Sequence, residues 1–312
     1  MKIAFLFSGQ GVQYRGMGQN LYQNYNESKA IFDKANDVVD WDLKEVCFTD
    51  EKELINQTRY TQSALFTTSV AAFEAAKAQG IVPEAVLGFS LGEYSALVAS
   101  GVMSFEEGLK LVEYRAQYMD DCTKEKEGMM AAVIGLTHTE INEVCDSVKE
   151  EGYEIVLAND NCPGQVVISG EKAAIEKATP LLKEKGARRV MPLRVSGAFH
   201  SPLMQEAANR LEAELGAFTM HAPQVPIVSN VTAEYMNQEE VKVNIPLQMT
   251  HGVRFRESIQ YLIEQGFDTF IEVGVKKTLC GFVTKISEDV KVFNIEDKES
   301  LEHVLSELGG LK

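Results

Sequence analysis

The chain has little positive charge and no long apolar run. Its 312 residues include 30 Lys and Arg against 46 Asp and Glu, a formal net charge of −16. A field of this sign repels a phosphate backbone, which argues against nucleic-acid binding. No apolar run approaches the ~18 residues of a membrane span, and the first, residues 3–7, is too short for a signal peptide. We therefore expect a cytoplasmic protein that binds neither nucleic acid nor membrane.

Cysteine is scarce and irregularly placed. None of the five cysteines forms a C-x-x-C pair, which argues against a disulfide framework and against a structural zinc site. We expect reduced thiols and no bound metal. The five are Cys47, Cys122, Cys145, Cys162 and Cys280.

What is present is the composition of an ordinary globular protein, with 45% apolar and 24% charged residues. Short apolar runs alternate with longer helical patterns, which predicts an α/β fold with a mostly parallel sheet and helices on its faces. Residues 125–195 differ, because their β-α-β-β-α-β order predicts an inserted ferredoxin-like small domain. We assign residues 1–124 and 196–312 to one large α/β-hydrolase-like catalytic domain.

The same patterns give bounds for single elements. Apolar residues at helical spacing predict helices over 20–39, 63–80 and 203–218. Short β-like runs predict strands over 154–158, 226–231, 269–273 and 291–295.

The sharpest local signal is the sequence G-F-S-L-G at residues 88–92. An apolar strand precedes it and a helical pattern follows it, as a nucleophile elbow requires. In such a turn the serine hydroxyl is exposed at the carboxyl edge of the sheet, and the N–H of the next residue, Leu91, faces a developing oxyanion. Ser90 is therefore a candidate nucleophile, with a chance match of so short a motif as the alternative.

A serine hydroxyl becomes a good nucleophile only when a neighbouring base takes its proton. His138, His221 and His303 have polar or helical surroundings typical of surface residues, and His251 lies in a polar loop where either role is open. His200 lies in the loop that returns the chain to the large domain, and sites tend to form at domain junctions. No Asp follows in the order of ordinary α/β-hydrolases, so we expect a neutral carbonyl to orient the imidazole.

Two further features leave two interpretations each. Residues 8–11, S-G-Q-G, lack the Lys-Ser/Thr of a P-loop and form either a plain tight turn or a turn whose N–H groups and Gln10 face the site. Arg115 lies on the helix after the elbow helix, where it is either solvated or buried as a clamp for a carboxylate.

Several strings together make the chain resemble the malonyl-CoA:acyl-carrier-protein transacylase family. They occur in order through essentially the whole chain, and their combination is highly specific. A freestanding chain of this length resembles the enzyme of fatty acid synthesis rather than a domain of a polyketide synthase. The strings are F-S-G-Q-G at 7–11, G-F-S-L-G-E-Y-S-A-L at 88–97, P-G-Q-V-V-I-S-G at 163–170 and A-F-H-S-P-L-M at 198–204, with Arg115 at its usual distance.

The resemblance implies a ping-pong acyl transfer that needs no cofactor. Ser90 would attack the malonyl thioester of CoA with His200 as the base, and the phosphopantetheine thiol of acyl carrier protein would then take the malonyl group. The N–H groups of Gln10 and Leu91 would bind the oxyanion. Arg115 would hold the free carboxylate of malonate, which explains selection of malonyl over acetyl.

Four more positions match the family residue by residue. Gln248 matches the position whose carbonyl supports the histidine, and Asn159 and Asn161 match residues that line the cleft. Phe199 fits the malonyl-type pattern, because its ring limits the room for a branching methyl. All four are expected at the substrate site.

The chain departs from the family pattern at two places. Many relatives have His at the position of Phe89, so any hydrogen bond that this His makes near the pocket is absent here, which affects fine acyl preference. Residues 274–277, G-V-K-K, lack the proline that commonly follows this glycine, so we expect a different loop near the cleft.

Acyl carrier proteins are acidic, so an anionic chain needs a locally basic face to bind one. Two clusters are candidates for this docking face, with ordinary solvated surface as the alternative. The first is Arg188 and Arg189 with Lys183 and Lys185 nearby, and the second is Lys276, Lys277 and Lys285.

Three other functions remain to be weighed. An acyl-thioester hydrolase would use the same Ser90 and His200 but admit water. A trans-acting acyltransferase of a polyketide synthase would differ only in its carrier protein. A non-catalytic scaffold that binds carrier protein has no need of these residues, so their presence argues against it.

Overall fold

The computed structural model describes residues 1–309, and its larger sheet has five parallel strands. They lie in the order β7-β2-β1-β8-β9, so the chain builds outward from β1 first to one side and then to the other. In parallel sheets, a crevice forms at the carboxyl ends of the strands beside such a reversal. The strands are β1 (Ile3–Phe7), β2 (Ala85–Gly88), β7 (Ile227–Val228), β8 (Thr269–Val273) and β9 (Lys291–Ile295).

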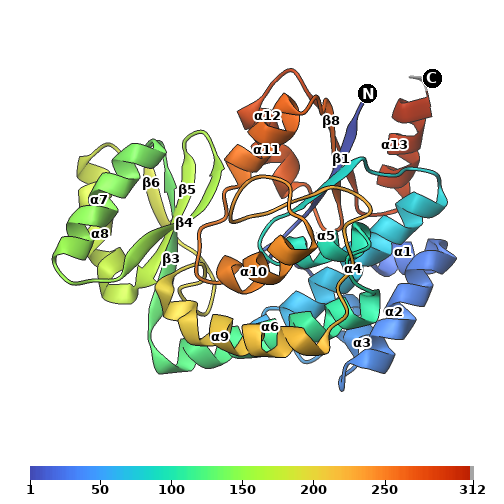
Figure 1. The fold of residues 1–312 in the computed structure, drawn as a ribbon, viewed down its shortest axis with the longest axis horizontal. Helices are drawn as coiled ribbons and strands as arrows, with labels where there is room; N and C mark the ends of the chain where they lie inside the picture. The colour runs from blue at the N-terminus through green and yellow to red at the C-terminus, as the bar shows by residue number, and fades with distance from the viewer. Residues whose placement is uncertain (310–312) are drawn as a thin grey trace.

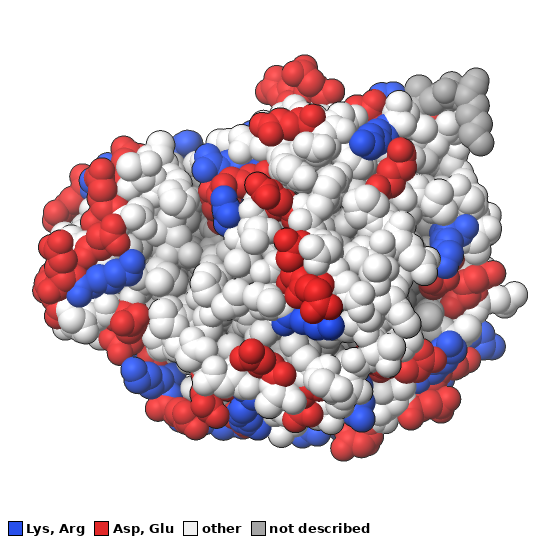
Figure 2. Space-filling model, in the orientation of Figure 1, with Lys and Arg blue, Asp and Glu red and all other residues white. Residues whose placement is uncertain are grey.

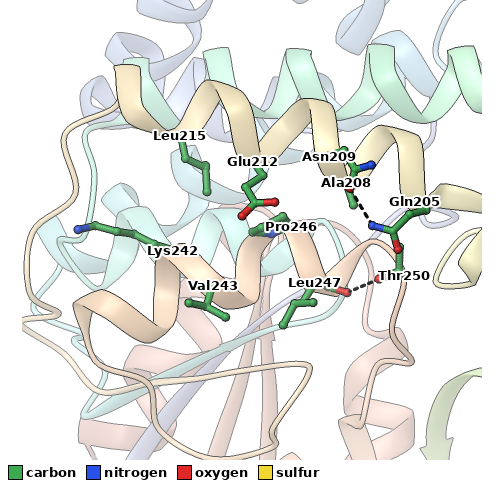
Figure 3. Close-up of a pocket in the computed structure, with 10 residues that line it drawn as sticks. All are labelled: Gln205, Ala208, Asn209, Glu212, Leu215, Lys242, Val243, Pro246, Leu247 and Thr250. Carbon is green, nitrogen blue, oxygen red and sulfur yellow. Dashed lines mark hydrogen bonds between the residues drawn. The ribbon is translucent and has the colours of Figure 1, made fainter.

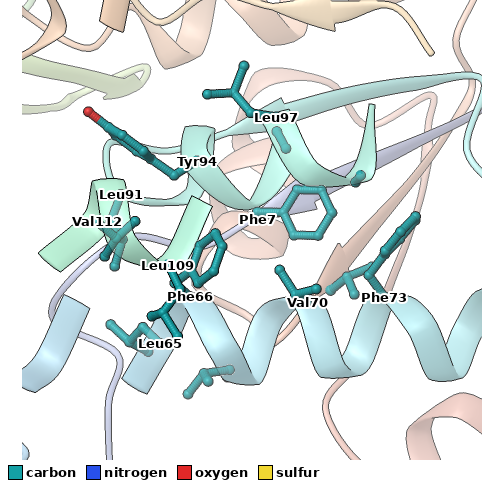
Figure 4. Packing of buried hydrophobic residues seen from close by; sticks show 14 of the residues in the cluster. Phe7, Leu65, Phe66, Val70, Phe73, Leu91, Tyr94, Leu97, Leu109 and Val112 are labelled. Carbon is teal, nitrogen blue, oxygen red and sulfur yellow. The ribbon is translucent and has the colours of Figure 1, made fainter. Parts of the chain in front are cut away.

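Alternate residues of β1 face opposite sides of this sheet, as the period of a strand requires. Phe5 and Phe7 pack against α4 (Thr58–Ala78), α5 (Gly92–Ala99) and α6 (Phe105–Glu125), as Figure 4 shows for Phe7. Ala4 and Leu6 pack against α11 (Phe255–Glu264) and α12 (Thr278–Ile286) on the other side. Strand β1 is therefore buried on both faces. This burial fixes the positions of the turns that follow β1 and its neighbour β2.

The second sheet is antiparallel, with the order β4-β5-β3-β6. Helices α7 (His138–Glu150) and α8 (Lys172–Glu184) cover one of its faces, and Figure 1 shows this small lobe beside the large sheet. The β-α-β-β-α-β order and this strand arrangement are those of a ferredoxin-like unit. Its strands are β3 (Gly128–Ile134), β4 (Ile155–Cys162), β5 (Gln165–Glu171) and β6 (Arg189–Pro192). We retain 125–195 as the proposed limits of the small domain.

Strand β4 is longer than the predicted 154–158, because its second half pairs with the large domain as well. Asn159 forms a bridge with Val253, and the Asp160 N–H donates to the Val253 carbonyl at 3.0 Å. Arg256 of α11 adds an ion pair to Asp160, with Nη2 2.8 Å from Oδ2. This junction holds the end of β4 against the large domain, beside the site described below.

The remaining elements correct several predicted bounds. The expected helix over 20–39 is two helices, because Tyr25 between them has an extended backbone. The expected strand over 226–231 ends at Val228, and the helix expected over 203–218 is regular only in its middle. The other helices are α1 (Gln19–Asn24), α2 (Asn26–Val38), α3 (Leu43–Phe48), α9 (Gln205–Glu214), α10 (Gln238–Gln248) and α13 (Lys298–Gly309).

The fold class agrees with the sequence prediction of a mostly parallel α/β sheet plus an inserted antiparallel unit. Among residues 1–309, no helix is both long and apolar enough to cross a bilayer.

Candidate active site

Ser90 lies in a sharp turn between β2 and α5, with a φ of 53° that few non-glycine residues adopt. Both flanking glycines are needed there for space. A Cβ on Gly88 would lie 1.9 Å from the Glu93 nitrogen, and one on Gly92 would lie 2.0 Å from the Phe7 carbonyl oxygen. The turn therefore presses against β1 and raises the Ser90 hydroxyl above the carboxyl edge of the sheet.

His200 lies within hydrogen-bond reach of this hydroxyl, with 2.8 Å between Ser90 Oγ and His200 Nε2. Its other ring nitrogen, Nδ1, faces the carbonyl oxygens of Gln248 at 2.8 Å and His251 at 3.2 Å. Because carbonyls only accept, Nδ1 carries the proton and Nε2 is free to accept one from the serine. The histidine is oriented by neutral carbonyls, and the second of them comes from a residue whose role the sequence left open.

Burial and, to a lesser extent, the nearby positive charge of Arg115 lower the pKa of His200 to about 4. The imidazole is therefore neutral at physiological pH, which is the form that a general base needs.

Arg115 is buried, and its guanidinium extends to the nucleophile. Nη1 donates to Gln62 Oε1 at 2.7 Å, while Nη2 donates to Gln248 Oε1 at 3.1 Å and to Ser90 Oγ at 3.2 Å. Within residues 1–309, no carboxylate lies within ion-pair distance of this guanidinium. A buried cation that only neutral groups hold is suited to bind an anionic ligand.

The two N–H groups expected to bind an oxyanion follow neighbouring strands. The Phe89 N–H donates to the Phe7 carbonyl at 2.9 Å, which places the segments after β1 and β2 side by side. Among the described residues, the backbone N–H groups of Gln10 and Leu91 donate to no protein acceptor. Both are therefore free to donate to a ligand beside Ser90.

Gln10 and Ser90 line a cavity of about 620 Å³ between the two sheets, and Leu91, which follows Ser90, is not among its lining residues. Asn159 and Asn161 line it from β4, and Oδ1 of Asn161 is buried without a hydrogen-bond partner in the described chain. Phe199 also lines it. Gln248 does not line the cavity, but it accepts hydrogen bonds from Arg115 and His200, which do line it. The lining also includes Ser8, Gly9, Gln10, Ser90, Arg115, Met130, Val167, Arg194, His200 and Leu279.

Phe89 closes one side of this cavity with an aromatic cluster. Its ring centroid lies 5.5 Å from that of Phe255 and 6.3 Å from that of Phe282. An apolar ring therefore fills this position, and the cavity wall there is hydrocarbon.

Three polar residues of the site were not singled out from the sequence. Gln62 holds Arg115, Asn230 accepts from the Ser90 N–H at 2.7 Å, and Glu93 accepts from Gln248 and Asn230. Glu93 is buried, and burial raises the pKa of its carboxyl to about 7. Of the three, only Glu93 stands in a sequence string that marked the site, directly after the elbow motif.

The predicted docking residues are all exposed, and they lie around the cavity rather than in it. Lys277 precedes Thr278, which lines the cavity, and Lys285 donates to Gln165, another lining residue, at 3.3 Å. Arg189 lies opposite Ile134, which itself lies opposite Gln165. On the face seen in Figure 2, acidic and basic side chains are interspersed without one continuous basic patch. The other two predicted docking residues are Arg188 and Lys276.

A separate hollow of about 370 Å³ lies between α9 and α10 (Figure 3). It contains none of the candidate catalytic residues. Its lining residues are Gln205, Ala208, Asn209, Glu212, Leu215, Lys242, Val243, Pro246, Leu247 and Thr250. Across residues 1–309, no group of three or more His, Cys, Asp or Glu side chains is placed to hold a metal ion.

Comparison with known proteins supplies the family. Residues 4–300 match the acyl transferase domain model. The malonyl CoA-acyl carrier protein transacylase of Bacillus subtilis is 43% identical over 308 residues, which cover 98% of this chain and 97% of that protein. The crystal structure of the corresponding Clostridium perfringens protein superposes with a TM-score of 0.96 at 40% identity, covering 100% of this chain and 98% of that one.

A third relative was solved with its partner. It is a malonyl-transacylase in complex with a type II polyketide acyl-carrier protein, with a TM-score of 0.95 at 35% identity, and the match covers 98% of this chain and 100% of that one. The matches extend over nearly the full length of each relative, and the chain belongs to the malonyl-CoA:acyl-carrier-protein transacylase family.

Proposed function

We propose that this protein transfers the malonyl group of malonyl-CoA to the phosphopantetheine thiol of acyl carrier protein, through an ester on Ser90. The observation that supports it best is the position of Arg115, a buried cation 3.2 Å from Ser90 Oγ with no carboxylate partner in the described chain. A thioester that carries a second, anionic carboxylate fits this arrangement, whereas an uncharged acyl group leaves the cation uncompensated.

In the first half-reaction, the Ser90 hydroxyl gives its proton to Nε2 of His200 while Oγ attacks the thioester carbonyl carbon. The resulting oxyanion accepts from the N–H groups of Gln10 and Leu91. The carbon–sulfur bond then breaks, and the proton on His200 passes to the sulfur of CoA. The products are free CoA and malonyl-Ser90.

The second half-reaction runs the same steps in reverse with another thiol. The pantetheine thiol gives its proton to His200, and its sulfur attacks the ester carbonyl carbon. The bond to Ser90 Oγ breaks, and Oγ takes the proton back from His200. All bonds and protons balance between protein and substrates, so the proposed mechanism uses no metal or other cofactor.

The remaining cavity residues are proposed to bind the substrates. Arg115 holds the malonate carboxylate, and Phe199 limits the space beside the acyl group. Asn159 and Asn161 face the path of the pantetheine arm, and the unpartnered Oδ1 of Asn161 is suited to accept an amide N–H from it. Gln248 does not line the cavity and acts by holding His200 and Arg115 in position.

Acyl carrier protein is the proposed partner. A relative that binds such a protein has the same fold over nearly the whole chain. The basic residues around the cavity are proposed as its docking surface: Arg188, Arg189, Lys276, Lys277 and Lys285. We place the reaction in the cytoplasm, in fatty acid synthesis, and a carrier protein of polyketide synthesis is the alternative acceptor.

The test is mass spectrometry of the protein after brief exposure to malonyl-CoA. We expect a gain of one malonyl group on the peptide that contains Ser90, its loss on addition of carrier protein, and no adduct on Ser90→Ala. Release of the adduct as free malonate, at the same rate with and without carrier protein, would identify a hydrolase instead.

A further inference from the structure

The backbone of Ser90 is held on both sides by side-chain amides. Its N–H donates to Asn230 Oδ1 at 2.7 Å, and its carbonyl accepts from Gln248 Nε2 at 3.0 Å. A serine with a φ of 53° is strained, and such a conformation persists only where the surroundings impose it. Together with the backbone N–H of Glu93, which donates to the Ser90 carbonyl at 3.1 Å, these two hydrogen bonds hold the backbone of Ser90 in that conformation.

One carboxylate holds the two residues that contribute these amides. Oε1 of Glu93 accepts the backbone N–H of Asn230 at 2.8 Å, and Oε2 of Glu93 accepts from the side-chain amide nitrogen, Nε2, of Gln248. Asn230 also donates to the Gly88 carbonyl at 2.6 Å, so the residues before, at and after the elbow are tied together. Glu93 is only 1% exposed, and it lies on the first turn of the helix that the elbow begins.

We propose that Glu93 is a positioning residue for acyl transfer, which fixes the strained Ser90 peptide from both sides through Asn230 and Gln248. This inference rests on the proposed function, because it assigns the residue a part in that reaction.

The geometry links Glu93 to the oxyanion. The Ser90 carbonyl and the Leu91 N–H belong to one planar peptide unit, so fixing the carbonyl fixes the direction of the N–H. Gln248 Nε2 and the backbone N–H of Glu93 both donate to that carbonyl, and the Glu93 carboxylate holds the side-chain amide of Gln248. The Leu91 N–H is the donor proposed to stabilise the transition state, so a misaligned peptide reduces kcat rather than substrate affinity.

Gln248 also contacts the other two groups of the proposed mechanism, Arg115 and His200. Gln248 accepts from Arg115 through its side-chain oxygen and from His200 through its backbone carbonyl. A rotation of this side chain would break its contacts with Ser90 and Arg115 together. Burial raises the pKa of Glu93 to about 7, which shows that the protein retains a carboxyl there against a desolvation cost.

The test compares Glu93→Gln with Glu272→Gln. Glutamine keeps the shape of Glu93, but its amide has one acceptor where two donors converge, so one hydrogen bond must fail. We expect kcat for malonyl transfer to fall about 10- to 100-fold, with KM for malonyl-CoA within about threefold of wild type. Glu93→Asp keeps both oxygens and should recover part of kcat.

Glu272 is a matched control because it is also fully buried with a raised pKa of about 7, and it accepts the Cys280 N–H at the start of α12. Its glutamine variant should lower the melting temperature while kcat stays within about threefold of wild type. Equal losses of kcat in both glutamine variants, or an unchanged kcat in Glu93→Gln, would overturn the proposal.

If Glu93→Gln does not fold, Asn230→Ala provides the test of the proposed positioning role. It removes the acceptor of the Ser90 N–H and the donor to the Gly88 carbonyl, but it keeps the backbone N–H that donates to Glu93. It should lower kcat with KM unchanged, whereas a proportional loss of folded protein and activity would contradict the proposal. Failure of the proposed function is distinguishable, since it appears in the wild-type protein as absence of a malonyl adduct on Ser90.

Discussion

Nη2 of Arg115 lies 3.2 Å from Oγ of Ser90, so the cation and the nucleophile share one corner of the cavity. The guanidinium donates to two amide oxygens, and no carboxylate of the described chain lies within ion-pair distance; the buried Glu93 interacts with it from farther away. In the proposed mechanism, this arrangement would hold a malonyl carboxylate a few bonds from the carbonyl carbon that Ser90 attacks. Arg115 would then both select the substrate and orient it.

Arg115→Ala should therefore separate malonyl from acetyl transfer. Two charge-assisted hydrogen bonds contribute about 3–5 kcal/mol, so we expect kcat/KM for malonyl-CoA to fall about 150- to 5,000-fold and that for acetyl-CoA to change less than about tenfold. Steady-state rates with both thioesters measure this. Arg210→Ala is the control, because Arg210 pairs with Asp121 outside the cavity and should leave both rates unchanged. Equal losses with the two thioesters would exclude the clamp.

His200 should remain neutral to unusually low pH. Burial lowers its pKa to about 4, and the charge of Arg115 acts in the same direction, so protonation begins only below about pH 5. Ring resonances from NMR, with His200 assigned by its absence in His200→Gln, measure the midpoint. In Arg115→Ala the midpoint should move upward, because a repelling charge is removed. A wild-type midpoint near the ordinary 6.5 would show that the imidazole is solvated.

The elbow glycines should tolerate no side chain. Gly88→Ala would place a Cβ 1.9 Å from the Glu93 nitrogen, and the backbone of α5 cannot move away without disturbing β1. We expect the free energy of unfolding to fall by about 3 kcal/mol or more, measured by urea denaturation. Gly281→Ala on α12 meets no atom within 4 Å and should raise stability by about 0.5–1 kcal/mol. A normal stability for Gly88→Ala would mean that the turn can relax.

Strands and the elbow were predictable from sequence because their signals are local. The strands predicted over 269–273 and 291–295 match β8 and β9 residue for residue, whereas the short runs at 154–158 and 226–231 gave the strand but not its bounds. Helix α10 gave no such signal. It contains Pro246, and it has apolar residues on both its buried face (Val241, Ile245) and its exposed face (Val243, Leu247). The sequence therefore shows no amphipathic helical pattern there.

The carboxylate network around Ser90 could not be predicted for a different reason. Glu93 is close in sequence to Ser90, but Asn230 and Gln248 come from segments more than a hundred residues away. Asn230 was expected inside a strand, where its side chain would face a helix layer; β7 ends two residues earlier and frees it to reach the elbow. Only the packing of α10 and this loop against the elbow brings the three together.

Reversing the basic residues around the cavity should impair only the second half-reaction. Arg188, Arg189, Lys276 and Lys277 are exposed, and none is within ion-pair distance of an acidic side chain in the described chain, so their charge is available to an acidic partner. With all four changed to Glu, we expect KM for carrier protein to rise about tenfold or more, while malonyl loading of Ser90 from CoA is unchanged. Raising the salt concentration should increase KM for the wild-type protein and have less effect on the variant.

The control for this surface changes the net charge by the same amount elsewhere. Lys29, Lys34, Lys52 and Lys77 are exposed on or near α2 and α4, and none lines the cavity. If the docking surface is local, their reversal to Glu should raise KM for carrier protein by less than about threefold, because screening at physiological salt limits charge effects to about 8 Å. Equal increases in the two quadruple variants would mean that carrier protein responds to the overall charge of the enzyme. Loss of malonyl loading in the first variant would mean instead that these residues bind CoA.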